Sequence, residues 1–214
     1  MFKIHIIKYR NKTNTFILHK ENGRTIVNPR FIRKTKIQFH GDNNRIEIYE
    51  PCKLHGAKFM LYNNDTFIIK KTKGSITVVG SAEGGNGAKL IIDENCTLNN
   101  TRFFLNSCPG AFITLGKDCM FSSDISIWAS DTHQIIDKTT HKVMNATKKG
   151  VVIGNHVWCG TRCTILKGTN VQDNSIIGAA SVVSGSFEPN VIIAGNPAKQ
   201  LKRGVSWKRE ALPE

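Results

Sequence analysis

The sequence predicts an all-β protein folded as a parallel β-helix, and a six-residue repeat is the main observation behind this prediction. From residue 153 the chain reads IGNHVW, CGTRCT, ILKGTN, VQDNSI, IGAASV and VSGSFE, and the first residue of each hexapeptide is apolar. The fifth residue is small or β-branched in five of the six hexapeptides. A period of six fits neither the helix period of about 3.6 nor simple strand alternation. It fits a short strand followed by a corner, and three such units close one coil.

Glycine and asparagine supply the second observation. The chain has 18 Gly and 19 Asn, and these residues adopt positive φ angles at the least cost. The pairs Asn43-Asn44, Asn63-Asn64 and Asn99-Asn100 separate β-rich segments. We expect them to form corners of earlier, less regular coils.

Shorter stretches of the same repeat precede residue 153. Leu115, Phe121 and Ile127 are spaced by six, and weaker traces occur at Ile92 and Leu98 and at Ile48, Leu54 and Met60. The fifth position of these repeats holds Cys52, Cys96, Cys119 and Cys163. The first position holds Cys159. We therefore expect these thiols to pack inside the coils, and we predict no metal site, since the chain has no Cys-x-x-Cys pair.

The chain is divided by this pattern into three regions. Residues 1–50 form a basic, β-rich N-terminal region, either early coils or a cap. Residues 51–197 form the β-helix, which a polar insertion at about 129–150 interrupts; such an insertion projects from one face of a solenoid and often carries function. Residues 198–214 form a tail, with a short helix expected at 198–204 after Pro197.

Composition and charge exclude several classes of protein. Hydrophobic residues make up 40% and charged residues 21%, which is typical of a globular domain. No apolar run approaches the roughly 18–20 residues of a membrane span, and the first ten residues do not resemble a signal peptide, so we expect a cytoplasmic protein with reduced thiols.

The net charge is +14, and residues 1–40 hold ten Lys or Arg against one acid, Glu21. This excess indicates either a solvated basic surface or attraction to a polyanion. No recognition helix, zinc finger or RNA-binding aromatic pattern accompanies the charge, so nucleic acid is not the expected partner.

Two residues stand out as candidates for chemistry. His133 lies in the insertion, in Ser-Asp-Thr-His, where a histidine acts either as a general base near neutral pH or simply as a surface residue. Trp158 ends its hexapeptide and should project outward. It serves either as an interface contact or as a stacking surface and N–H donor to an oxyanion.

Four segments carry a resemblance to a known family: SDTHQIID, VVIGNHVWCGTRCTILKG, SIIGAASVV and VIIAGNPAK. They resemble bacterial hexapeptide-repeat acyltransferases, which fold as left-handed β-helices. A loop histidine followed by VWxG and AGxPAK is typical of acetyl-CoA-dependent O-acetyltransferases. The likeness is greatest to capsular polysialic acid O-acetyltransferases and extends from about residue 116 to 209, a little under half of the chain.

The resemblance implies an acyltransferase of the EC 2.3.1 type that moves acetyl from acetyl-CoA to a hydroxyl of a bacterial surface polysaccharide. This acceptor would be a capsule or O-antigen, and an anionic polymer such as one of sialic acid is expected. His133 would be the general base of a direct ternary-complex reaction, and Trp158 the family's conserved tryptophan. The implied acetyl-CoA-binding residues are Trp158, Gly160, Thr161, Gly178, Ala179, Ser184, Lys199 and Lys202.

The family usually forms homotrimers with active sites between subunits, so the same is expected of this chain. Ser184 departs from the tyrosine of the capsular enzymes and matches the broader group of sugar acetyltransferases, which leaves the acceptor open.

Three alternatives remain at this point. The chain acetylates an amino group of a sugar, or it is a non-enzymatic polyanion-binding β-helix, or it is a γ-type carbonic anhydrase. The last needs three histidines around zinc, and Lys138 stands where a histidine partner of His133 would be required.

Overall fold

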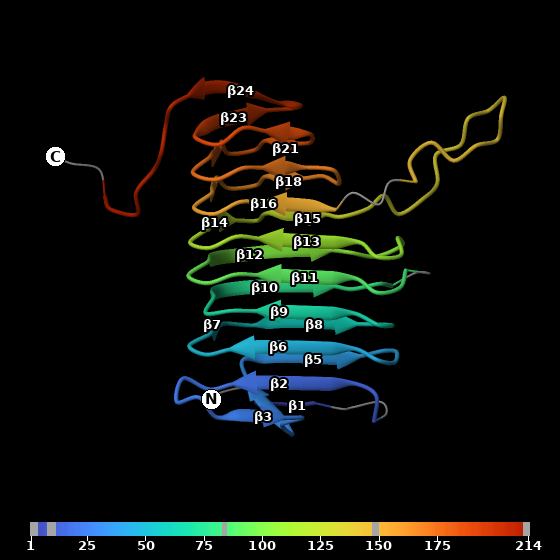
Figure 1. The fold of residues 1–214 in the computed structure, drawn as a ribbon, viewed down its shortest axis with the longest axis vertical. Coiled ribbons are helices and arrows are strands. Elements are labelled where there is room, and N and C mark those ends of the chain that lie inside the picture. The colour runs from blue at the N-terminus through green and yellow to red at the C-terminus, as the bar shows by residue number, and fades with distance from the viewer. Residues whose placement is uncertain (1–3, 8–11, 83–84, 147–149, 212–214) are drawn as a thin grey trace.

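The computed structural model describes residues 4–7, 12–82, 85–146 and 150–211, and every regular element within them is a β-strand. The strands stack as coils along one long axis, from the N-terminal end of the molecule to the C-terminal end (Figure 1). The chain is a left-handed parallel β-helix, which confirms the predicted fold class.

Each coil contributes strands to three faces, and the first face is a single ladder of parallel strands. Its members are β2 (Thr15–His19), β6 (Arg45–Tyr49), β9 (Thr66–Ile69), β11 (Lys89–Ile92), β13 (Phe112–Leu115), β16 (Val151–Ile153), β19 (Asn170–Val171) and β22 (Ser186–Phe187).

The second and third faces are joined because two strands turn the corner between them. These are β10 (Lys73–Val79) and β12 (Thr97–Phe104), whose registers shift at Gly74/Ile76 and Leu98/Asn99. The second face is completed by β7 (Lys53–Leu54), β14 (Met120–Ser123), β17 (Trp158–Cys159), β20 (Ile176–Ile177) and β23 (Val191–Gly195). The third face is completed by β5 (Thr35–Phe39), β8 (Ala57–Leu61), β15 (Ser126–Trp128), β18 (Thr164–Ile165) and β21 (Val182–Val183).

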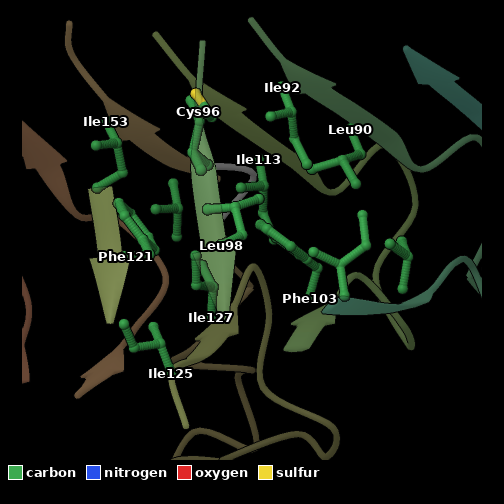
Figure 2. Close-up of a cluster of buried hydrophobic side chains, with 14 of the residues drawn as sticks. Leu90, Ile92, Cys96, Leu98, Phe103, Ile113, Phe121, Ile125, Ile127 and Ile153 are labelled. Atoms are coloured by element: carbon green, nitrogen blue, oxygen red, sulfur yellow. The ribbon is translucent and has the colours of Figure 1, made fainter. Parts of the chain in front are cut away.

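The hexapeptide repeat sets which side chains point inward. The first residues of the six hexapeptides are at most 2% exposed: Ile153, Cys159, Ile165, Val171, Ile177 and Val183. The fourth residues of the first five have φ angles between 54° and 74°: His156, Arg162, Gly168, Asn174 and Ala180. The fifth residues of the first five are buried as well: Val157, Cys163, Thr169, Ser175 and Ser181. Each hexapeptide therefore encodes two inward side chains and one left-handed corner. Figure 2 shows the ladder in the middle coils, where Leu98, Phe121 and Ile127 converge on the same interior.

The cysteines occupy the interior as predicted, with one exception. Cys96, Cys119, Cys159 and Cys163 are buried, whereas Cys52 is half-buried. Burial raises the pKa of the Cys159 thiol well above its ordinary value, and burial likewise raises that of Cys52 to about 11. Thiols held in their neutral form are poor nucleophiles.

The N-terminal coils are longer than the hexapeptide repeat implies, and the expected inward position of Met60 is wrong. Phe59 and Leu61 are fully buried, while Met60 on the same strand is half-exposed. Five-residue strands such as β8 alternate inward and outward, so two or three side chains point inward and the phase of six is lost.

Residues before 50 already belong to the stack. β2 pairs in parallel with β6, and β5 pairs in parallel with β8. Antiparallel strands cover this end: β3 (Thr25–Val27) pairs with β2, and β1 (Ile4–Ile6) pairs with β4 (Phe31–Arg33).

The short C-terminal helix expected at 198–204 is wrong. These residues form β24 (Ala198–Arg203), which lies antiparallel to β23. The last coil would otherwise expose the unpaired N–H and C=O groups of β23, and a strand satisfies them where a short helix would not.

Candidate active site

The insertion leaves the body between β15 and β16, at the border of the third and first faces, which we call the loop edge. Ile136 and Val143 form an antiparallel bridge, so the segment folds back as a hairpin that projects far from the coils (Figure 1). Residues 147–149 of the predicted insertion lie outside the described residues. Ser130 is buried at the base of the hairpin, whereas His133 is exposed.

His133 lines a pocket of about 400 Å³ at the base of the hairpin. One wall of this pocket is the connection between β12 and β13, which contributes Ser107 and Cys108. Asp131 and Lys167 add charged groups. The pocket thus places an imidazole, a carboxylate and an ammonium group around one opening, a set of groups that can hold a polar molecule and exchange a proton with it.

Asn145 holds the main chain at His133 and just after it. Its side-chain N–H group donates to the carbonyl oxygen of His133 over 2.8 Å, and its side-chain oxygen accepts from the N–H of Ile135 over 2.8 Å. The same amide nitrogen donates to Asp131 Oδ2 over 2.6 Å. One side chain therefore ties the two strands of the hairpin together at His133.

Lys167 attaches this arrangement to the body of the β-helix. Its Nζ lies 2.6 Å from Asp131 Oδ2 and donates to the main-chain oxygen of Asn145 over 2.9 Å. Partial burial raises the pKa of Asp131, but the hydrogen bonds from Lys167 and Asn145 outweigh it and hold that pKa below its ordinary value. Asp131 is thus a charged anchor of the hairpin, and no contact joins its carboxylate to the His133 ring among the described residues.

The hairpin exposes an unusual amount of apolar surface. Ile135, Ile136 and Met144 are 57%, 54% and 67% exposed. Exposed apolar side chains gathered on a projecting segment mark a contact with another surface.

The border of the second and third faces, which we call the glycine edge, holds four of the predicted acetyl-CoA residues. Gly160 stacks on Gly178 and Ala179 of the next coil, and a Cβ atom at Gly160 would lie 2.6 Å from the nitrogen of Ala179. Only glycine lets these coils approach so closely. Thr161 donates its hydroxyl to the oxygen of Ser123 over 2.9 Å, and Ala179 is exposed. Small side chains and main chain line this part of the edge, and the exposed Arg162 stands at the corner beside Thr161.

Trp158 projects outward from the second face, as predicted, and is 37% exposed. It stands in register between Met120 and Ile176 of the neighbouring coils, so an apolar stripe runs along this face. Its ring lies 6.2 Å from that of Trp207.

Trp207 belongs to a C-terminal arm, residues 204–211, that turns back along the coils at the border of the first and second faces. Its ring stacks on His156 at 4.2 Å, and its indole N–H donates to the oxygen of His156 over 2.7 Å. Arg209 lies 2.9 Å from Asp118. Partial burial raises the pKa of Asp118, but hydrogen bonds from His156 and Arg209 outweigh it and lower that pKa below its ordinary value. His156 is thus a structural contact of the arm.

The remaining predicted site residues lie apart from one another. Ser184 is exposed just after β21, on the loop edge rather than on the glycine edge. Lys199 and Lys202 are exposed on β24, where they lie opposite Ala194 and Ile192.

One chain therefore does not bring the predicted site together. The pocket around His133 contains none of the predicted acetyl-CoA residues. The loop edge and the glycine edge lie on opposite sides of the third face. The repeat gave no signal for Asn145, Lys167 or Cys108, because the first and last lie in connections and Lys167 lies at a corner.

The described residues contain neither a cluster of metal ligands nor a membrane-spanning helix. No group of three or more His, Cys, Asp or Glu side chains in this part of the chain could hold a metal ion. No helix in the described part of the chain is long and apolar enough to cross a membrane.

No protein-family model matches the chain, but individual relatives do. The chain is 33% identical over 140 residues to a polysialic acid O-acetyltransferase of Escherichia coli O1:K1, covering 65% of this chain and 42% of that protein. It is 34% identical over 135 residues to a polysialic acid O-acetyltransferase of Neisseria meningitidis, covering 63% and 60%. It is also 49% identical over 98 residues to a putative lipopolysaccharide biosynthesis O-acetyl transferase of Escherichia coli K12, covering 42% and 50%. The chain spans about half the length of the curated relatives it matches.

Two solved structures share the fold over most of the chain. The polySia-specific acetyltransferase NeuO superposes with a TM-score of 0.79 at 28% identity, covering 94% of this chain and 88% of that one. The polysialic acid O-acetyltransferase OatWY superposes with a TM-score of 0.72 at 29% identity, covering 84% and 86%. The resemblance drawn from the four sequence segments is thereby confirmed.

Proposed function

We propose that the chain is an acetyl-CoA-dependent O-acetyltransferase acting on a hydroxyl of a bacterial surface polysaccharide, with His133 as the general base. The observation that carries this proposal is the pocket at the base of the hairpin, where His133 is exposed and its main chain is held by Asn145. The names of the relatives, O-acetyltransferases of polysialic acid and of lipopolysaccharide synthesis, support the class of acceptor. The use of acetyl-CoA, which is made in the cytoplasm, and the absence of disulfides among the described cysteines favour a cytoplasmic location.

Acetyl-CoA fits the glycine edge. Gly160, Thr161 and Ala179 present only small side chains, so an extended pantetheine chain can lie against the coils there, beside the exposed Arg162. Lys199 and Lys202 are exposed cations at the C-terminal end of the stack and would pair with phosphate groups.

In the proposed reaction, His133 accepts the proton of the sugar hydroxyl while the hydroxyl oxygen attacks the thioester carbonyl carbon. The indole N–H of Trp158 donates to the carbonyl oxygen as negative charge develops there. The C–S bond then breaks, the acetyl group stays on the sugar oxygen, and His133 returns the proton to the sulfur. Histidine suits both transfers because its ordinary pKa lies near neutral pH.

We further propose that the site is completed by a neighbouring copy in a trimer. If three chains turn their third faces toward a common axis, the loop edge of one meets the glycine edge of the next, and the ring closes. The C-terminal part of the third face is suited to such contact, since β15, β18 and β21 carry no charged residue. The exposed Ile135, Ile136 and Met144 of the hairpin would be covered at the same time.

The experiment that tests this function is thiol release from acetyl-CoA, with a panel of capsular and O-antigen glycans, for the wild type and His133→Ala. We expect glycan-dependent release that falls by about 10²–10⁴-fold in the variant, the usual contribution of a general base. His141→Ala, in the same hairpin, is the matched control and should keep the wild-type rate. Unchanged thiol release by His133→Ala would contradict the role of His133 as general base. No thiol release with any glycan would contradict the proposed acetyltransferase function.

A second candidate keeps the same site and replaces the hydroxyl by an amino group. The same panel decides between them, because the product of N-acetylation resists mild alkaline hydrolysis and an O-acetyl ester does not.

A further inference from the structure

The charges on the strands of the second and third faces are divided along the β-helix as far as β23; β24, beyond it, carries Lys199, Lys202 and Arg203. In the N-terminal coils, the strands β5, β7, β8, β10 and β12 contain five basic residues and no acidic one. The five are Lys36, Lys53, Lys58, Lys73 and Arg102, and all are exposed. In the C-terminal coils, β14, β15, β17, β18, β20 and β21 contain no charged residue at all.

The basic side chains are placed where they repel one another. Lys36 is directly opposite Lys58 on adjacent strands of the third face, and Lys53 is directly opposite Lys73 on the second face. Adjacent strands lie about 4.8 Å apart, and like charges opposite each other at that spacing destabilise a sheet. No ion pair of the described residues involves any of the five. The chain itself therefore does not offset the repulsion, and an external anion would.

We propose that these five residues form a binding track for an anionic polysaccharide, the polymer whose hydroxyl is acetylated. This inference rests on the proposed function and adds where the polymer lies. Carboxylate groups repeated along the polymer would neutralise the repeated ammonium and guanidinium groups.

The track leads toward the glycine edge. Lys36, Lys58 and Arg102 stack on the third face along the axis, and the same face continues through β15 to β18, which follows Thr161. From β5 to β18 the distance is about 24 Å, at about 4.8 Å for each strand. A polymer of several sugar units bound there would reach the edge at which acetyl transfer is proposed.

The same division of charge explains how the track stays accessible in a trimer. Three copies of an unneutralised basic strip repel one another, so the N-terminal coils would stand apart while the uncharged third-face strands β15, β18 and β21 pack together. A space between the N-terminal coils remains for the polymer.

The test is binding of polysialic acid at low ionic strength, measured by calorimetry, with neutral dextran and single-stranded DNA as comparison ligands. The track variant combines Lys36→Gln, Lys58→Gln and Arg102→Gln. The control variant combines Arg24→Gln, Lys89→Gln and Lys117→Gln, three exposed cations outside the track that remove the same charge.

We expect the track variant to bind polysialic acid roughly tenfold more weakly or worse, as the loss of three exposed ion pairs implies, and the control variant to bind within about twofold of wild type. Dextran should not bind. Equal weakening by both variants, or no weakening by the track variant, would overturn the proposal. If the track bound DNA and did not bind polysialic acid, the assignment of an anionic polysaccharide as its ligand would be wrong.

Thiol release from acetyl-CoA is measured on the same samples and separates the two proposals. Polysialic acid that binds through the track without any thiol release would contradict the acetyl transfer alone. Glycan-dependent release that is equal in both triple variants would contradict the track alone.

Discussion

Asn145 and His133 are joined across the hairpin by a hydrogen bond of 2.8 Å from the side-chain amide of the first to the main-chain oxygen of the second. The bond acts on the backbone of His133 rather than on its ring. It leaves the imidazole free to meet a hydroxyl while the position of its Cα atom is fixed. A small side chain with both a donor and an acceptor is required, since the N–H of Ile135 bonds to the same amide.

Replacing Asn145 by Ala should lower kcat and leave acetyl-CoA affinity unchanged. Without the amide, the main chain at His133 is no longer held, and displacement of a catalytic group by about 1 Å costs up to roughly 10²-fold in rate. Thiol-release kinetics give kcat, and calorimetry gives the affinity for coenzyme A. Lys138→Ala, an exposed position in the same hairpin, serves as the control. A rise in KM with unchanged kcat would show that Asn145 acts in binding instead.

Replacing Gly160 by Ala should destabilise the coils at the glycine edge. The added Cβ would lie 2.6 Å from the nitrogen and 2.9 Å from the Cα atom of Ala179, both main-chain atoms that cannot move away. Overpacking of this kind costs about 1–3 kcal/mol of unfolding free energy, which denaturant titration measures. Ala180→Gly, one coil further, removes a methyl group from a residue with φ of 57° and should not destabilise. Equal stability of Gly160→Ala and the wild type would contradict the close stacking.

The C-terminal arm should detach at acid pH. The pKa of Asp118 is lowered in the folded chain, so its contacts stabilise the arm above the ordinary value of 3.8, and this stabilisation is lost as the pH falls through the lowered pKa. Tryptophan fluorescence should therefore change below pH 3.8, and Asp118→Asn should show the detached signal at neutral pH. Trp207→Phe assigns the signal to the arm. A signal that is the same in Asp118→Asn and the wild type would contradict the role of the carboxylate.

The inward positions of the C-terminal coils could be predicted from sequence residue by residue, because each hexapeptide repeats an inward pair, its first and fifth residues, and one left-handed corner. Ile177 and Asn174 are examples of the two. The N-terminal coils could be predicted only as β-rich. Their strands are longer, as Phe59 and Leu61 show by pointing inward from one strand, and alternation along strands of different length replaces the spacing of six.

The site could be predicted only in part, for a different reason. His133 and Trp158 could be selected by residue type, because an imidazole can act as a general base and an indole N–H can act as a hydrogen-bond donor. Asn145 and Lys167 act through main-chain contacts that depend on how the hairpin folds back, and no local pattern encodes that. The C-terminal segment was wrongly expected to be helical because the need to cover β23 arises from the stack of coils and not from residues 198–203 themselves.

The central claim is that acetyl transfer takes place at a site shared by two copies of the chain, and complementation tests it most directly. His133→Ala removes the base on the loop edge, and Trp158→Ala removes the donor beside the glycine edge, so each variant alone should be nearly inactive. The two are unfolded together, refolded as mixed trimers and assayed for polysialic acid-dependent thiol release. If the site is shared, random mixing restores up to about a quarter of wild-type activity, because one site in four receives both intact halves. Mixed trimers that form and remain as inactive as either variant alone would contradict the shared site.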